Sequence, residues 1–271
     1  MLSITSDFVT DKGCPGPYLK MIADEGFSHI HWCHQWNTDF LYSDCEIEQI
    51  EKWLKEYGLK LTDLHASVGP EKNWGSLIEY ERQAGVLLVK NRLDMTACLG
   101  GAAIVMHLPP GIFIEQDKEK CWEQLFRSLD TLEPYAKERN IKIAVENGDF
   151  PSLNKVFTKY GKDFIGLCYD CGHGNLLPGE TGIDELEKVK DRLIATHLHD
   201  NDGTKDQHKL IFSGSINWKR LAGVIASSAY KKWLNMEPSI RNTGITEPVI
   251  FLKEAFKTGN KFSKMVDELR K

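Results

Sequence analysis

The chain has 271 residues, of which 41% are hydrophobic and 10% aromatic, and its formal net charge at pH 7 is −5. This length and composition are typical of a globular domain with a substantial core. No stretch approaches the roughly 18 consecutive apolar residues of a membrane span, and an acidic balance without a dense Lys/Arg run disfavours a nucleic-acid ligand.

The start of the chain and its cysteines indicate where the protein works. The first residues, Met-Leu-Ser-Ile-Thr-Ser-Asp, lack the basic and apolar regions of a signal peptide, so the sequence predicts a cytoplasmic protein. The seven scattered cysteines do not resemble a disulfide framework. Cys168 and Cys171 form a CxxC pair, but no second pair completes a structural zinc site. Because Cys168 lies inside an apolar run, a redox role for the pair is disfavoured.

Eight short apolar runs alternate with longer amphipathic segments along the chain. The runs cover residues 2–8, 27–33, 59–65, 102–108, 141–146, 164–170, 194–199 and 233–237. Between them, apolar residues recur every three or four positions, which predicts helices over segments that include 46–57, 119–139 and 247–269. A helix end with Gly or Asn precedes a run both in 54–65 and in 136–146, so the two segments form a weak internal repeat.

This alternation favours parallel strands with helices outside them. Eight such units in about 250 residues match a (β/α)8 TIM barrel. An open doubly wound sheet is the rival fold, but no GxGxxG follows the first run. No linker rich in Pro, Gly or Ser divides the chain, so the sequence predicts one α/β domain, a single (β/α)8 barrel over residues 1–271.

Four successive runs end on a carboxylate or an imidazole: Glu146, Asp170, His199 and Glu237. The carboxyl ends of barrel strands surround one mouth, so these side chains are predicted to hold one divalent cation together. Three carboxylates and one imidazole favour Mn²⁺, Mg²⁺ or Co²⁺, and Zn²⁺ accepts the same ligands. Each acid taken singly fits a helix N-cap or an ion pair equally well. Their joint occurrence at four run ends favours the metal site.

Further polar side chains follow the runs and extend the predicted mouth. They are His65, His107, His173, Asp206 and His208. Asp206 and His208 lie in the loop after the seventh run, and the irregular segments 109–111, 172–181 and 200–216 are predicted to lie over the mouth. His29, His31 and His34 around the second run are left out, because the sequence pairs them with no carboxylate.

Several motifs together resemble those of the xylose isomerase-like barrel superfamily. They are Val-Glu146-Asn, Tyr-Asp170-Cys-Gly-His173, His-Leu-His199-Asp-Asn-Asp-Gly, Asp206-Gln-His208 with Gly214, and Met-Glu237. The resemblance covers nearly the whole chain. This superfamily includes sugar isomerases and epimerases, inosose dehydratases and the endonuclease IV branch.

The epimerase branch implies a chemistry for these residues. There, the positions of Glu146, Asp170, His199 and Glu237 bind one divalent metal, and the resemblance implies that the two glutamates are the acid/base pair. The metal stabilises an enediolate formed by proton transfer next to a carbonyl. The resemblance also implies that His173 binds a substrate hydroxyl.

Other side chains at the mouth are predicted to contact a small sugar or polyol-ketone. They are His65, His107 and Lys205, with Phe8, Trp32, Trp36 and Trp74 available either to stack on a sugar ring or to pack loops. Lys205 occurs where free-ketose epimerases usually carry an arginine. This departure keeps isomerase, epimerase and inosose dehydratase activities all open.

The endonuclease IV branch implies a different chemistry, the hydrolysis of a phosphodiester at abasic DNA by three zinc ions. Its nine ligand positions match His65, His107, Glu146, Asp170, His173, His199, Asp206, His208 and Glu237. The acidic balance and the first loop, Thr-Ser-Asp-Phe-Val-Thr-Asp-Lys-Gly, disfavour this alternative. A barrel that senses a sugar without turnover is a third alternative. Pairing of exposed barrel helices into a homo-oligomer also stays open.

Overall fold

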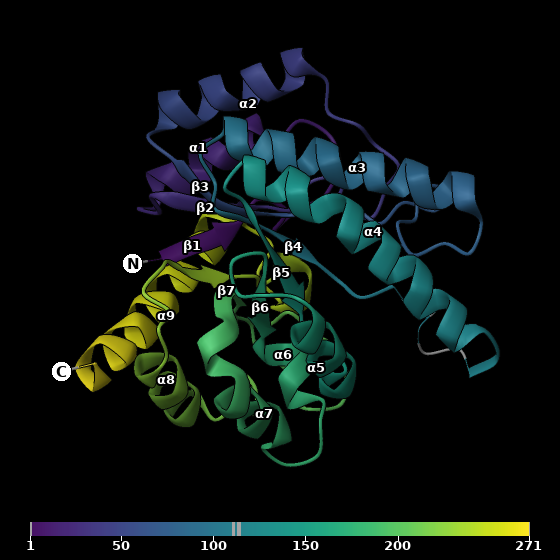
Figure 1. Ribbon diagram of the computed structural model, residues 1–271. Coiled ribbons are helices and arrows are strands. Elements are labelled where there is room, and N and C mark those ends of the chain that lie inside the picture. The colour runs from purple at the N-terminus through teal and green to yellow at the C-terminus, as the bar shows by residue number, and fades with distance from the viewer. Residues whose placement is uncertain (1, 110–111, 113–114, 271) are drawn as a thin grey trace.

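Eight parallel strands form a barrel in the computed structural model, which describes residues 2–109, 112 and 115–270 (Figure 1). The strands are β1 (Leu2–Thr5), β2 (His29–Trp32), β3 (Lys60–His65), β4 (Ala103–Met106), β5 (Lys142–Glu146), β6 (Ile165–Asp170), β7 (Leu193–His197) and β8 (Leu234–Met236). Their order in the sheet is β7-β6-β5-β4-β3-β2-β1-β8. A parallel bridge between Leu198 and Met236 joins the two ends of this order and closes the barrel. The predicted (β/α)8 fold is confirmed.

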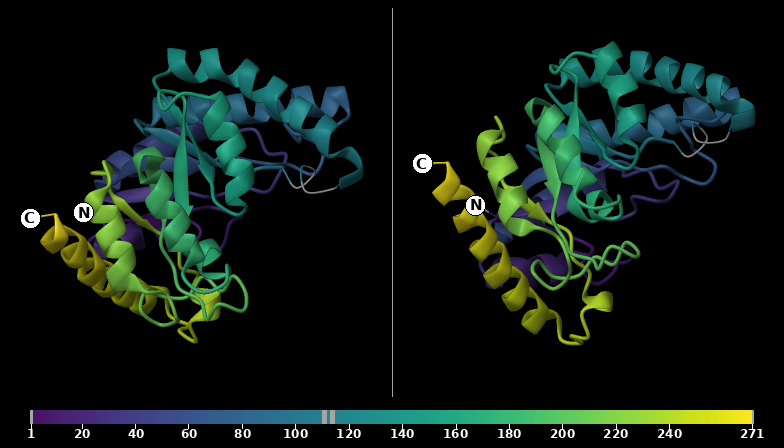
Figure 2. Two further views of the ribbon diagram at one scale, coloured as in Figure 1. Left: turned by 60° about the horizontal axis from the view of Figure 1, so that its bottom comes forward. Right: turned by 90° about the horizontal axis from the view of Figure 1, so that it is seen from below.

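Helices connect the strands and surround the barrel (Figures 1 and 2). They are α1 (Gly16–Asp24), α2 (Asp44–Tyr57), α3 (Glu79–Cys98), α4 (Lys118–Glu138), α5 (Phe150–Lys159), α6 (Cys171–Asn175), α7 (Thr181–Val189), α8 (Trp218–Ser227) and α9 (Pro248–Leu269), with short 3-10 turns η2 (Glu115–Asp117), η3 (Lys190–Arg192) and η4 (Ile240–Asn242). The helices predicted over 46–57, 119–139 and 247–269 are found as α2, α4 and α9, with ends that differ by no more than two residues. None of the helices in the described part of the chain is long and apolar enough to cross a membrane.

Helix α2 shows how the local sequence sets these boundaries. Ser43 and Glu46 form a reciprocal capping box at its start, and Gly58 ends it with a left-handed φ of 69°. Between these ends, Ile47 and Leu54 are buried against the barrel. The helix therefore begins and ends where its own residues satisfy the free backbone groups.

The barrel interior changes from apolar to polar towards the carboxyl ends of the strands. A small buried cluster of Val105, Ala144, Cys168 and Ala195 lines the lumen on its β4–β7 side. Because side chains alternate along a strand, the residues two positions further on also face the lumen. These are His107, Glu146, Asp170 and His197. On the β4–β7 side, the polar site thus lies directly above an apolar layer.

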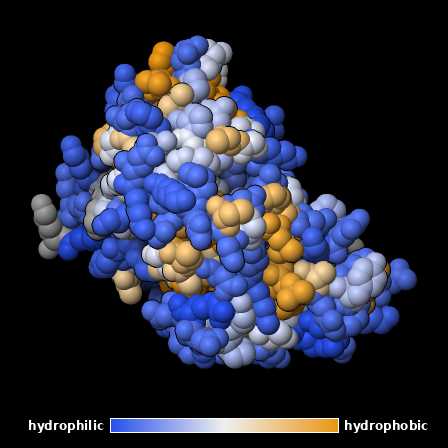
Figure 3. All heavy atoms as spheres, turned by 90° about the horizontal axis from the view of Figure 1, so that it is seen from above, coloured by the Kyte–Doolittle hydropathy of each residue, from blue (hydrophilic) through white to orange (hydrophobic). Residues whose placement is uncertain are grey.

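The outer surface is mostly hydrophilic where it is seen from above in Figure 3, with smaller apolar patches. Exposed apolar side chains include Ile78 and Leu87, which are 50% and 61% exposed. Scattered side chains of this kind are ordinary on protein surfaces and give no argument for association. A homo-oligomer therefore stays a prediction.

Candidate metal centre

The carboxyl end of the barrel opens into a cavity of about 400 Å³. Its wall includes Phe8, Trp36, His65, His107, Glu146, His173, Asp206, His208, Glu237 and Arg241. Asp170, His197 and His199 lie beside this cavity and are 0–1% exposed. Of the loop expected at 109–111, only Pro109 is among the described residues.

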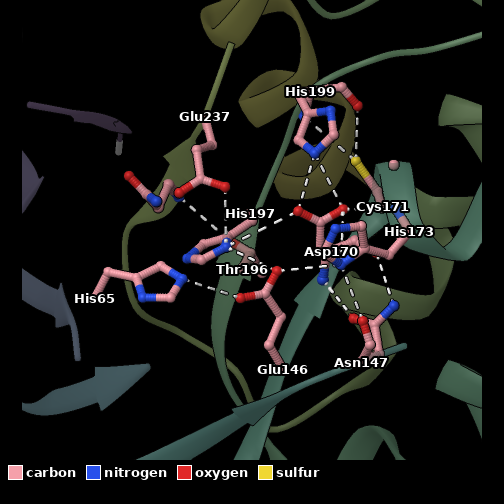
Figure 4. A network of polar contacts seen from close by, with 12 residues as sticks. His65, Glu146, Asn147, Asp170, Cys171, His173, Thr196, His197, His199 and Glu237 are labelled. Carbon is pink, nitrogen blue, oxygen red and sulfur yellow. Dashed lines mark hydrogen bonds and ion pairs between the residues drawn. The ribbon is translucent and has the colours of Figure 1, made fainter. Parts of the chain in front are cut away.

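Three carboxylates surround one imidazole nitrogen at the centre of the site (Figure 4). The Nδ1 atom of His197 lies 3.1 Å from Oε2 of Glu237, 3.4 Å from Oε1 of Glu146 and 3.9 Å from Oδ2 of Asp170. Neither ring nitrogen of His197 has a hydrogen-bond partner among the described residues, and neither does Oε2 of Glu146. Buried polar atoms are normally paired. A cation bound among these atoms would satisfy them.

The charges of this centre are mutually dependent. Burial raises the pKa of Glu146, but the charges of His107 and His197 lower it by more than burial raises it. The pKa therefore lies well below its usual range. Burial also raises the pKa of Glu237, but His197 lowers it by more, so this pKa too lies below its usual range. Burial lowers the pKa of His197, while Cys168, Glu237 and Glu146 raise it well above the usual value. These opposite shifts have one cause, the attraction between the buried imidazole and the two carboxylates.

Asn147 and Asp170 fix the relative positions of β5 and β6 at the site. The side chain of Asn147 donates to the carbonyl of Asp170 at 2.9 Å and accepts from its backbone N–H at 2.6 Å. Oδ1 of Asp170 in turn accepts from the backbone N–H of His173 at 2.7 Å and so caps α6. Gly172 leaves room for the His199 ring, with which a Cβ would collide.

His199 lies at the edge of the three-carboxylate group. Its Nε2 atom is 2.9 Å and 3.1 Å from the two oxygens of Asp170. The ring stacks on His208, with centroids 3.9 Å apart. The structure thus brings all four predicted ligands together, but it places His197, which the sequence analysis passed over, nearer to the two glutamates.

A second group consists of His65, His107 and Glu146. The two Nε2 atoms lie 3.2 Å apart, and they are 3.5 Å and 3.4 Å from Oε2 of Glu146. A tetrahedral zinc ion with ligands at about 2.0–2.1 Å separates those ligands by about 3.3–3.4 Å. The triangle therefore has the size of one face of a zinc site.

A third group joins Asp206 to His173 and His208. Oδ2 of Asp206 lies 2.9 Å from Nε2 of His208 and 3.5 Å from Nε2 of His173. Burial lowers the pKa of His208, but Asp206 and Glu237 raise it to about 10. Burial also lowers the pKa of His173, while Asp170, Asp206 and Glu146 raise it to about 12. Both imidazoles are thus charged partners of the surrounding acids.

The remaining predicted contacts are distributed unevenly. Lys205 is exposed and is not part of the cavity wall, so its role in binding substrate stays a prediction. Arg241, from η4, is the only lysine or arginine among the wall residues that the structure describes. The ring centroids of Trp36 and His65 are 4.8 Å apart. Trp32 and Trp74 are buried and are not part of the cavity wall.

His31 corrects the sequence analysis, which left it out for want of a carboxylate partner. Its Nδ1 atom lies 2.6 Å from Oδ1 of Asp63, and its Nε2 atom lies 3.5 Å from Oε1 of Glu237. Strand alternation carries the missed signal, since Asp63 and His65 are two residues apart on β3 and face the same lumen. The partner of His31 lies on the next strand rather than nearby in sequence.

The model of the xylose isomerase-like TIM barrel family matches residues 19–255. The chain belongs to this family. The protein y4fM of Sinorhizobium fredii is 37% identical over 248 residues, 81% of this chain and 79% of that protein. A probable endonuclease 4 of Oceanobacillus iheyensis is 26% identical over 166 residues, 53% of this chain and 54% of its own. The crystal structure of a D-tagatose 3-epimerase-like protein matches with a TM-score of 0.78 and 20% identity, over 98% of both chains, and so shares the fold.

Proposed function

We propose that this chain is a sugar isomerase or epimerase that depends on a divalent metal and moves a proton through an enediolate. The observation that carries the proposal is the approach of two glutamates to one point. Glu146, at the end of β5, and Glu237, just after β8, both reach Nδ1 of His197 within 3.4 Å (Figure 4). The similarity in fold to a D-tagatose 3-epimerase-like protein supports it.

The residues present fit a divalent cation. Glu146, Asp170 and Glu237 would hold it with His199 as the predicted imidazole, and His197 offers a second imidazole, whose Nδ1 lies 3.1 Å from Oε2 of Glu237. When bound, such an ion polarises a carbonyl and an adjacent hydroxyl and stabilises the negative charge of an enediolate. Carboxylates with one imidazole favour Mn²⁺, Mg²⁺ or Co²⁺, and a second imidazole increases the fit to Zn²⁺.

The side chains around the centre would bind substrate and transfer the proton. Glu146 and Glu237 both approach the centre of the site, so one of them would take a proton from the carbon next to the carbonyl. The other, once it has taken a proton from solvent, would give that proton to the opposite face or to the adjacent carbon. His173 would hold a substrate hydroxyl, and Trp36 would face the apolar side of the sugar ring.

Two measurements test this proposal. Asp170→Asn and Glu237→Gln should each lose the central cation, while Glu138→Gln, a change in an exposed side chain of α4, should keep it. Solvent deuterium should enter a carbon-bound position of a ketose, aldose or inosose that the enzyme turns over. Unchanged metal content in both site variants, or no deuterium exchange across such a panel, would contradict the proposal.

The imidazole that holds the cation can be identified separately. His197→Ala and His199→Ala differ by two positions on one strand end, so each is the control for the other. Because His197 is nearer to the two glutamates, we expect its removal to weaken cation binding more. If His197→Ala weakens cation binding no more than His199→Ala does, His199 alone is the imidazole ligand.

A specific observation favours a second candidate function, the hydrolysis of a phosphodiester. The groups around His65 with His107 and around Asp206 with His208 flank the centre, as three zinc ions would require. Zinc ions placed this way can activate water and neutralise phosphate charge. Cleavage of an abasic-site duplex that depends on three zinc ions per chain would replace the sugar proposal. One bound ion and no cleavage would exclude this candidate.

A further inference from the structure

One cluster of potential ligands, formed by His31, Cys33 and Glu237, lies on the β1–β2 side of the centre, and two of its members, His31 and Cys33, take no part in the proposed proton transfer. His31 is 0% exposed, Cys33 3% and Glu237 8%. Their potential ligand atoms all lie within 4.8 Å of one another. Nε2 of His31 is 3.5 Å and Sγ of Cys33 is 3.7 Å from the same oxygen, Oε1 of Glu237.

The nitrogen of His31 points to a missing ligand. Nε2 is buried and has no hydrogen-bond partner among the described residues. Its other nitrogen, Nδ1, lies 2.6 Å from Oδ1 of Asp63, which is itself only 6% exposed. A carboxylate behind Nδ1 favours the tautomer that carries its proton on Nδ1 and has a lone pair on Nε2. Metal-binding histidines are oriented in this way by a carboxylate behind the ring.

The distances match the dimensions of a tetrahedral zinc site. With sulfur at about 2.3 Å and oxygen or nitrogen at about 2.0–2.1 Å from the ion, a sulfur and an oxygen ligand are separated by about 3.5–3.6 Å and a nitrogen and an oxygen by about 3.3–3.4 Å. The observed separations are 3.7 Å and 3.5 Å. Cys33 and Glu237 also form part of the cavity wall, so an ion and a water as fourth ligand can enter from there.

We propose that His31, Cys33 and Glu237 form an additional zinc site, in which Asp63 orients His31 and Glu237 bridges to the central cation. The two oxygens of Glu237 already face different partners, with Oε2 towards His197 and Oε1 towards His31 and Cys33. The thiol of Cys33 would lose its proton on binding, as coordinating thiols do. A thiolate and an imidazole favour Zn²⁺ over Mg²⁺ or Mn²⁺ at this position. This inference goes beyond the proposed activity, and only the bridging role of Glu237 rests on the proposed central cation.

Titration of the metal-free protein with Co²⁺ tests the site, because thiolate ligation gives cobalt a charge-transfer absorption in the near ultraviolet. The wild-type protein should develop this absorption, and Cys33→Ser should lose it together with one bound ion per chain. Cys121→Ser is the matched control, since Cys121 is also buried but lies on α4 outside the lumen. Asp63→Asn should keep the absorption and weaken the binding behind it by about 10–100-fold.

The outcomes separate this site from the central one. Asp170→Asn removes a predicted ligand of the central cation but none of this cluster, so the absorption should survive in that variant. Its absence from the wild-type protein at saturating Co²⁺ would overturn the site. Its persistence in Cys33→Ser would do the same, because the thiolate would then be another one, such as Cys168. Its loss in Asp170→Asn would overturn the independence of the site.

Discussion

Removal of the Asn147 side chain should destabilise the protein and loosen the metal centre together. Its amide pairs with both the N–H and the C=O of Asp170, at 2.6 Å and 2.9 Å, and Asn147 is 1% exposed. In Asn147→Ala both backbone groups remain buried without partners. Each unpaired group costs about 1–3 kcal/mol, so the free energy of unfolding should fall by about 2–6 kcal/mol.

Urea denaturation at pH 7 in the presence of a chelator measures this loss without any contribution from a bound ion. Asn154→Ala is the matched control, because Asn154 is exposed on α5, and its effect should stay below about 0.5 kcal/mol. Calorimetric titration with Mn²⁺ or Zn²⁺ should show affinity about 10–100-fold weaker in Asn147→Ala, since the residue orients a predicted ligand. A loss of stability equal to that of the control, with unchanged affinity, would refute this reasoning.

Three further predictions concern charge and space. Hydrogen bonds from Arg82 lower the pKa of Glu79 from 4.5 to about 2, so its stabilisation is complete above pH 4.5 and is lost as the pH falls from 4.5 to 2. Glu79→Gln should therefore lower the free energy of unfolding at pH 6 and have no effect near pH 2 in denaturation curves. Because the pKa of His197 is raised, cation binding at pH 7 should release a proton, and calorimetry in buffers of different ionisation enthalpy should detect it; no buffer dependence would contradict an imidazolium there. Gly172→Ala should displace the His199 ring and weaken cation binding by about 10-fold with an unchanged circular dichroism spectrum, whereas full affinity would show that the ring is not a ligand.

The sequence predicts the barrel well because its signals are local. Apolar runs, amphipathic helices and helix ends such as Gly58 are each readable within a few residues. Glu146 and Asp170 are found for the same reason, since each is the last residue of its strand. The sequence pattern alone identifies a site residue wherever a carboxylate is the last residue of a strand.

Other parts of the site depend on contacts between strands, which one sequence does not reveal. The predicted run extended to His199, but β7 ends at His197. The histidine at the end of the strand is therefore one that the sequence analysis did not name. His31 meets Asp63 only because β2 and β3 are neighbours in register. Arg241 reaches the cavity wall from η4, whereas Lys205, the cation that the sequence analysis named, is not among the wall residues.

The closure of the barrel lies at the same place as the candidate ligands. Beyond β7 the seam is held by two backbone hydrogen bonds, from Leu198 N–H to the Asn235 carbonyl and from Glu237 N–H to the Leu198 carbonyl, both 3.0 Å. An ion bound by Glu237 together with His197 or His199 would link the two sides of this seam. Opening the seam would then release the ion. Amide hydrogen exchange at Leu198 and Glu237 should therefore slow when a cation binds. Cation release and opening of the barrel seam would then be coupled.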